Sequence, residues 1–289
     1  MDRTMRIERA LAAALADATP VPCPPRLAGA AHHAVFPGGA RIRPRLCLAV
    51  AGACGEDNPG LVDAAATAIE LMHCASLVHD DLPCFDDAPT RRGEPSIHRA
   101  FGERLAVLGG DALIVVAFQT LARQVLAAPD RASALLLALA RSVGMPSGIV
   151  AGQAWECEPH VVLADYQRAK TGALFAAATT SGAIATGADP APWRALGERL
   201  GEAYQVADDI RDAAGDAEQL GKPTGRDAAL GRPSAATQLG VAGAIARLEH
   251  LVAGALESIP PCPGRDALRE AILGEARGLV PKELLRRAA

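Results

Sequence analysis

Helical periodicity runs through almost the whole chain and is broken only by short segments rich in proline or glycine. Alanine and leucine dominate, aromatic residues make up 3% of the sequence, and such straight or small side chains lose little freedom in a helix. No alternating strand pattern, fixed repeat or long polar linker is present. The sequence therefore predicts one all-α domain over residues 1–289, with helices near 4–17, 41–54, 60–82, 104–127, 130–144, 163–186, 191–212, 234–257 and 265–287.

Composition argues against several classes of protein. The net charge is −4 and no basic stripe with interleaved aromatic residues appears, so we expect no nucleic-acid binding. The 7 cysteines form no Cys-x-x-Cys pair, which is typical of a reduced intracellular protein. The N-terminus does not read as a signal peptide, and no uncharged stretch reaches the ~20 apolar residues needed to span a bilayer. We expect a cytoplasmic protein without an integral membrane segment.

Two of the predicted helices end in clusters of aspartates. The helix at 60–82 carries Asp80 and Asp81, with Asp86 after a bend, and the helix at 191–212 carries Asp208, Asp209 and Asp212. Carboxylates near a helix C-terminus face the negative end of the helix dipole, which costs roughly 0.3–1 kcal/mol each. A solvated acidic cap would explain the first cluster alone. Both clusters together favour Mg²⁺, which binds hard oxygen ligands and substrate phosphates, bridging a diphosphate between them.

Cationic side chains lie close to each acidic cluster. Segment 38–44 combines a glycine turn with Arg41 and Arg43, and further charge comes from Arg91, Arg92, Lys170 and Lys222. The planar guanidinium suits bidentate binding of phosphate, although a single lysine is more often an ordinary surface residue.

His73 shares a helix face with Ser76 and Asp80, so it either faces the same pocket or is an ordinary core histidine. A zinc site built from His73, Cys74, His79 and Cys84 is possible, but its spacing is poor.

These residues resemble the trans-isoprenyl diphosphate synthases over nearly the whole chain. The resemblance rests on five segments in the family's order, namely 38–44, Asp80-Asp81-x4-Asp86 with 91–93, 170–172, 205–212 and 221–227. The residues at 70–81 are most similar to those of geranylgeranyl diphosphate synthases from bacteria that make carotenoids and bacteriochlorophyll. The resemblance implies a single-domain orthogonal helical bundle around a deep central cavity, Mg²⁺ as cofactor and a homodimer.

The resemblance also implies a role for each matching residue. Asp80, Asp86 and Asp208 would bind Mg²⁺ directly, and Asp81, Asp209 and Asp212 directly or through water. The allylic diphosphate would be held by Arg91, Lys170 and Lys222, and isopentenyl diphosphate by Arg43, His73 and Arg92. Thr171 and Gln205 would face the developing allylic cation.

The chain departs from the family pattern at three positions. It has Ala40 where a lysine is usual, so we expect either that Arg41 compensates or that affinity for isopentenyl diphosphate is lower. Arg211 stands where an apolar residue is usual, and Glu156 where an aspartate is usual.

The implied reaction condenses isopentenyl diphosphate with a dimethylallyl, geranyl or farnesyl primer by ionisation, condensation and elimination. Small Ala75, five residues before Asp80, implies a deep tunnel and the C20 product, unless Ala75 only allows close helix packing. A farnesyl diphosphate synthase remains an alternative. A terpene cyclase would not need segments 38–44 and 91–93, and a non-catalytic partner subunit remains open because of Ala40.

Overall fold

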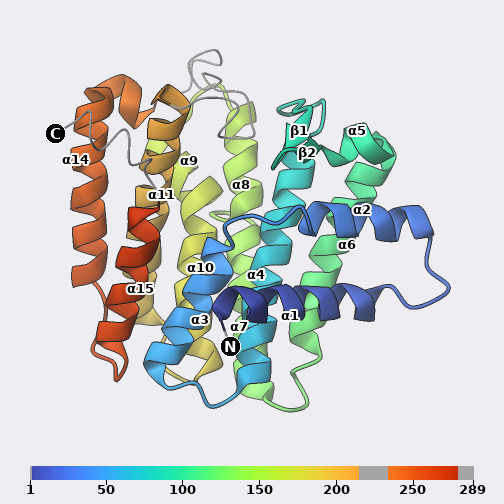
Figure 1. Cartoon of the computed structure of the whole chain (residues 1–289), viewed down its shortest axis with the longest axis horizontal. Helices are drawn as coiled ribbons and strands as arrows, with labels where there is room; N and C mark the ends of the chain where they lie inside the picture. The colour runs from blue at the N-terminus through green and yellow to red at the C-terminus, as the bar shows by residue number, and fades with distance from the viewer. Residues whose placement is uncertain (1, 215–233, 279–289) are drawn as a thin grey trace.

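The longest helices run side by side, and two helices near the N-terminus lie across them (Figure 1). The structure is a computed structural model that describes residues 2–214 and 234–278. The long helices are α4 (Pro59–Asp80), α6 (Glu103–Ala122), α7 (Pro129–Val143), α10 (Ala173–Ala185), α11 (Arg194–Ala214) and α14 (Ala235–Glu257). The crossing helices are α1 (Arg3–Ala18) and α2 (Pro25–Val35). The predicted all-α bundle is therefore confirmed.

The remaining elements lie between these helices or, for α15, after them. They are α3 (Ile42–Cys54), α5 (Ile97–Phe101), α8 (Ile149–Ala154), α9 (Leu163–Gln167) and α15 (Arg265–Arg277), with 3₁₀ turns at Trp155–Cys157 and Ala191–Trp193 and a π-helical turn at Arg168–Gly172. The described sheet is one antiparallel pair, β1 (Thr90–Arg91) and β2 (Glu94–Pro95), in which Thr90 faces Pro95. These connections matter because several of them carry the polar residues of the site.

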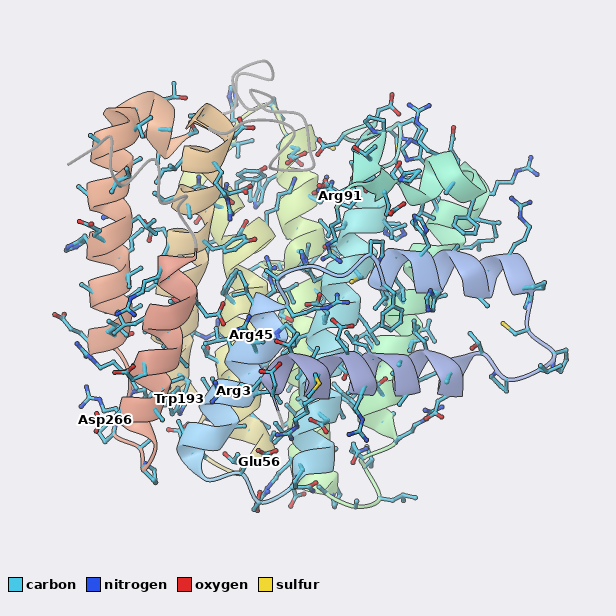
Figure 2. All side chains as sticks on the ribbon, viewed as in Figure 1. Arg3, Arg45, Glu56, Arg91, Trp193 and Asp266 are labelled. Atoms are coloured by element: carbon cyan, nitrogen blue, oxygen red, sulfur yellow. The ribbon has the colours of Figure 1, made fainter. Side chains whose placement is uncertain are left out.

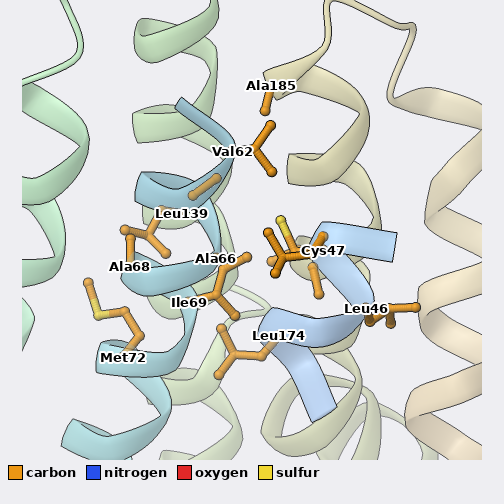
Figure 3. Packing of buried hydrophobic residues seen from close by; sticks show 14 of the residues in the cluster. Leu46, Cys47, Val62, Ala66, Ala68, Ile69, Met72, Leu139, Leu174 and Ala185 are labelled. Atoms are coloured by element: carbon orange, nitrogen blue, oxygen red, sulfur yellow. The ribbon is translucent and has the colours of Figure 1, made fainter. Parts of the chain in front are cut away.

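Helix α4 forms the centre of the core, and its alanines allow its neighbours to approach closely. Figure 3 shows Val62, Ile69 and Met72 of α4 beside residues of α3, α7 and α10. Helices α3 and α10 meet at Gly182, where a Cβ atom would lie 2.6 Å from the carbonyl oxygen of Cys47. Each buried large aliphatic side chain contributes about 1.5–3 kcal/mol. This packing fixes the acidic end of α4 in space.

The sequence did not predict some of the elements. Helix α2 lies between the predicted helices at 4–17 and 41–54, and it begins at Pro25, whose fixed φ suits the first helical position. The expected helix at 163–186 is interrupted by the π-helical turn. A π-helical turn adds one residue to a helical turn, and the apolar pattern stays helical on both sides of it. The sequence pattern therefore does not reveal the interruption.

Three described helices are long and apolar enough to cross a membrane by length and composition. They are α4, α6 and α14, and 78%, 39% and 39% of their apolar windows are buried within the protein. Each of these helices carries charged residues, such as Asp111 in α6 and Arg247 in α14, so none of them is an uncharged stretch of about 20 apolar residues. That the protein has no integral membrane segment stays a prediction. The burial of α4 shows that its apolar character serves the core.

Candidate active site

A cavity of about 500 Å³ opens beside the acidic ends of α4 and α11. Its wall contains almost all described residues that the sequence singled out: Arg41, Arg43, His73, Asp80, Asp86, Arg91, Arg92, Lys170, Thr171, Gln205, Asp208, Asp209 and Asp212. Ala75 and Asp81 do not line it, and Lys222 lies outside the described residues. Segments far apart in the sequence thus converge on one polar pocket.

The first aspartate cluster is shaped by the loop that ends α4. The amide of Asp86 donates to the carbonyl oxygen of Asp80 at 2.9 Å, and the amide of Ala88 donates to that of Asp81 at 3.2 Å. Pro83 cannot donate a helical hydrogen bond, so the chain turns back here. The turn brings Asp86 to the cavity beside Asp80, as the motif spacing predicts.

Asp81 does not line the cavity with Asp80 and Asp86, and its predicted binding of the metal, directly or through water, stays a prediction. Its side chain is 4% exposed and accepts hydrogen bonds from Arg91, whose Nε lies 3.0 Å from Oδ1. Burial raises the pKa of Asp81, and the Arg91 guanidinium opposes that shift. Asp81 therefore anchors Arg91 of β1, which Figure 2 labels beside the end of α4, and Arg91 in turn lines the cavity.

Arg41 does not compensate for Ala40 in this structure, because its guanidinium is committed inside the protein. The side chain is fully buried and donates to Glu70 at 2.7 Å, to Glu8 at 2.8 Å and to the Val35 carbonyl at 2.7 Å. These bonds tie α1 and α2 to the base of the site. Ala40 itself is exposed and lines the cavity.

A cationic group occupies the wall next to Ala40. The Arg43 guanidinium lies 4.7 Å from the ring centroid of Phe175 and 5.7 Å from that of Tyr204, and its Nε has no partner among the described residues. Burial lowers the pKa of Arg43, as does the charge of Arg92. Burial and the arginines around it hold the pKa of His73 well below its usual range, so this imidazole is neutral near pH 7. Such crowding of positive charge favours an anionic ligand.

Gly39 allows Arg92 to reach this wall. A Cβ atom on Gly39 would lie 2.8 Å from Cζ of Arg92, and the φ of 142° at this glycine disfavours other residues. The glycine of segment 38–44 thus makes room for a guanidinium.

The facing wall is built on the π-helical turn. Lys170 Nζ lies 2.5 Å from Glu156 Oε1 and 3.5 Å from Asp80 Oδ1, and the Thr171 hydroxyl donates to Gln205 Oε1 at 2.9 Å. π-Helical turns often occur at functional sites because they re-aim side chains.

Two further polar residues of this wall were not predicted. Gln153 donates to Asp80 Oδ1 at 2.9 Å, and the Tyr166 hydroxyl donates to Glu156 at 2.6 Å. Gln153 precedes Glu156 by three residues, a helical spacing that was a usable signal.

The second aspartate cluster lies in the last turns of α11. Asp208 and Asp212 line the cavity one turn apart, and Arg211 Nη2 lies 3.2 Å from Asp208 Oδ1. Asp209 is buried and accepts hydrogen bonds from Gln205 at 3.0 Å and from the amide of Ala235 at 2.7 Å. Asp209 therefore ties α11 to the N-terminus of α14, where a negative charge is favourable.

Comparisons with known proteins identify the family. Residues 24–253 match the family model described as polyprenyl synthetase. The chain belongs to this family. It is 56% identical to a geranylgeranyl diphosphate synthase of Cereibacter sphaeroides over 98% of both chains, and 53% identical to one of Rhodobacter capsulatus over 94% of both. It also matches the structure of a Helicobacter pylori geranyltransferase complexed with magnesium and isoprenyl diphosphate, with 29% identity, a TM-score of 0.80, and coverage of 96% of this chain and 98% of that one.

The acids of this polyprenyl synthetase suit a metal that is shared with a substrate. Among residues 2–214 and 234–278, no three histidine, cysteine or acidic side chains gather closely enough to hold a metal by themselves. The alternative of a zinc site at His73 and its neighbours is therefore wrong for the described residues. Asp80 and Asp86 face the cavity from one wall and Asp208 and Asp212 from the other. An oxygen-only set split in this way fits Mg²⁺ that also binds phosphate oxygens.

The position of Lys170 depends on close contact between α8 and the π-helical turn. A Cβ atom on Gly152 would lie 2.4 Å from the backbone nitrogen of Lys170 and 2.5 Å from its Cα. Because backbone cannot rotate away, we expect Gly152→Ala to push the turn outward, to lower kcat about tenfold or more, and to lower Tm.

Gly274→Ala is a matched control for this substitution, because nothing lies within 4 Å of a Cβ there. Steady-state kinetics and thermal unfolding measure both effects. Equal kinetics for Gly152→Ala and the native chain would contradict this account.

Proposed function

We propose that the chain is a Mg²⁺-dependent prenyltransferase that condenses isopentenyl diphosphate with an allylic diphosphate and releases geranylgeranyl diphosphate. The observation that carries the proposal is the single cavity in which two aspartate-bearing helices face a group of cationic side chains. The two bacterial relatives with that activity, at 56% and 53% identity, support the product.

Isopentenyl diphosphate binds in this proposal to the wall formed by Arg43, His73 and Arg92. The two guanidiniums supply charge, and the neutral imidazole supplies a hydrogen bond without adding to the repulsion between them. The allylic diphosphate binds to Arg91 and Lys170, next to Asp80. The two substrates thus occupy adjacent parts of one cavity.

Ionisation of the allylic substrate requires charge stabilisation on both fragments. Lys170 and Arg91 neutralise the departing diphosphate, and the oxygens of Thr171 and Gln205 face the allylic cation. Mg²⁺, held by Asp80, Asp86, Asp208 and Asp212, would supply further positive charge to the diphosphates. Apolar residues below the polar rim, among them Ile149 and Leu77, exclude water that would trap the cation as an alcohol.

The test is incubation of the pure protein with Mg²⁺, isopentenyl diphosphate and each primer, followed by mass spectrometry of the products. We expect geranylgeranyl diphosphate and loss of activity with EDTA. Farnesyl diphosphate as the final product would contradict the chain length, and cyclic hydrocarbons would indicate a terpene cyclase. The absence of elongation with every primer would overturn the proposal and favour a non-catalytic subunit.

We also propose a homodimer that buries the outer face of α6. Leu108 and Val115 lie seven residues apart on one face and are 52% and 53% exposed, and Leu137 of neighbouring α7 is 51% exposed. Light scattering during gel filtration should give twice the chain mass for the native protein. Leu108→Glu with Val115→Glu should give a monomer, and an unchanged mass would contradict this interface.

The site of action proposed for this enzyme is the cytoplasm. The product would serve carotenoid synthesis, as the resemblance implies. Fractionation of the native host and carotenoid content after deletion of the gene would test the two statements.

A further inference from the structure

Arg211 brings a positive charge into the cavity at a position that the proposed reaction does not use. It lies on α11 one turn after Asp208, lines the cavity and is 19% exposed. Placing a guanidinium here removes it from most of its water, which costs free energy unless a partner is supplied. An anionic partner in the cavity would offset this cost of desolvation.

The contacts of Arg211 extend toward the Arg43 wall. Its Cζ lies 5.4 Å from the ring centroid of Tyr204, and Cζ of Arg43 lies 5.7 Å from the same centroid. A guanidinium near an aromatic ring is attracted to the face of the ring without using its N–H groups. Tyr204 therefore gathers two cationic groups on the side of the cavity assigned to isopentenyl diphosphate.

The hydrogen bonding of Arg211 differs from that of Arg41 and Arg91. Arg41 and Arg91 donate to buried carboxylates that do not bind the metal in this proposal. Arg211 makes one hydrogen bond among the described residues, at 3.2 Å to Asp208, which is an acid assigned to Mg²⁺. A guanidinium has five N–H donors, so most of those of Arg211 have no hydrogen-bond partner among residues 2–214 and 234–278.

We propose that Arg211 is a substrate-binding residue that donates to the diphosphate of isopentenyl diphosphate. This inference rests on the proposed function, which places that substrate beside Arg43. Arg211 supplies a further positive charge to a cavity in whose lining Ala40 carries none. The ordinary explanation is a helical ion pair with Asp208, which is worth about 0–1 kcal/mol and gives no preference between the two substrates.

The experiment compares Arg211→Leu with the native enzyme in steady-state kinetics and in direct binding. We expect the KM for isopentenyl diphosphate to rise about tenfold, the size of a lost charge-assisted hydrogen bond, with the KM for the allylic primer unchanged within about twofold. Calorimetric titration of isopentenyl diphosphate, with a non-ionisable primer analogue present, should show the same loss of affinity. Arg211→Lys should retain most of the native affinity for isopentenyl diphosphate, because it keeps the positive charge.

Two further variants separate charge from structure. Ala40→Lys in the Arg211→Leu background should restore the affinity for isopentenyl diphosphate, because it returns a cation to the same cavity. Arg194→Leu removes an equal charge from the outer surface of α11, where it pairs with Glu198 at 3.6 Å, and should change neither KM.

Three results would overturn the inference. They are an unchanged affinity for isopentenyl diphosphate, an altered Mg²⁺ dependence without a change in that affinity, and an equal loss for both substrates. If the native protein itself fails to elongate any primer, the proposed function fails instead.

Discussion

Asp80→Asn and Asp208→Asn are each expected to lower kcat by about 10²–10³-fold or more while leaving the fold intact. Each acid lines the cavity from a different helix, so each substitution removes one side of the arrangement that, in the proposed function, holds the metal and diphosphate. Their side chains are 16% and 36% exposed, and the amide is nearly the same size as the carboxylate. The substitution also removes like charge at the negative end of a helix dipole, so Tm should stay equal or rise.

Kinetics with each substrate, together with thermal unfolding, measure these effects. Asp130→Asn, in the exposed first turn of α7, is the matched control and should keep the native kinetics. Its Tm should stay equal or fall slightly, because a negative charge is favourable at a helix N-terminus. Turnover near the native value in either Asp80→Asn or Asp208→Asn would contradict the model of two facing clusters. Loss of activity together with loss of the folded state would show that the acid is structural.

Asp81 shows what motif spacing can and cannot predict. The adjacent acids Asp80 and Asp81 are chemically equal in the sequence, and successive helical residues point about 100° apart. One of the pair must therefore turn from the cavity, and the choice depends on where Arg91 lies. Arg91 is brought there by the β1–β2 turn, which sequence periodicity does not reveal. The acidic cluster could be predicted from the sequence. Which of the two aspartates lines the cavity and which one binds Arg91 could not.

Arg41 and Arg43 also have different surroundings, although they lie two residues apart in the sequence. Both were predicted to bind substrate, and both belong to one glycine-rich segment. The structure commits Arg41 to Glu8 and Glu70, and the partner Glu8 comes from a helix more than thirty residues earlier. Pairing at such distance in the sequence depends on the packing of α1, which no local pattern describes. Periodicity was sufficient for α4 and α11, where apolar faces and acidic ends coincide.

Ser76, and not Ala75, is the residue at this level of α4 that lines the cavity. Ala75 is 1% exposed within the core and does not line the cavity, whereas its neighbour Ser76 does. Ser76 lies on the face of α4 that carries His73 and Asp80, one turn before Asp80. A phenylalanine at position 76 would therefore enter the cavity directly, next to the place proposed for the diphosphates. At position 75 it must first displace packed neighbours, which costs about 1–3 kcal/mol.

Ser76→Phe is accordingly expected to shift the product from geranylgeranyl to farnesyl diphosphate without loss of stability. Ala75→Phe should give the same shift with a lower Tm, because the ring reaches the allylic tail only by moving the wall. Ala75→Ser, which adds little volume, should leave the product unchanged. Mass spectrometry of the products and thermal unfolding distinguish the cases. If both phenylalanine variants still release geranylgeranyl diphosphate, the floor of the tunnel lies on another helix, and α4 sets only the position of the diphosphates.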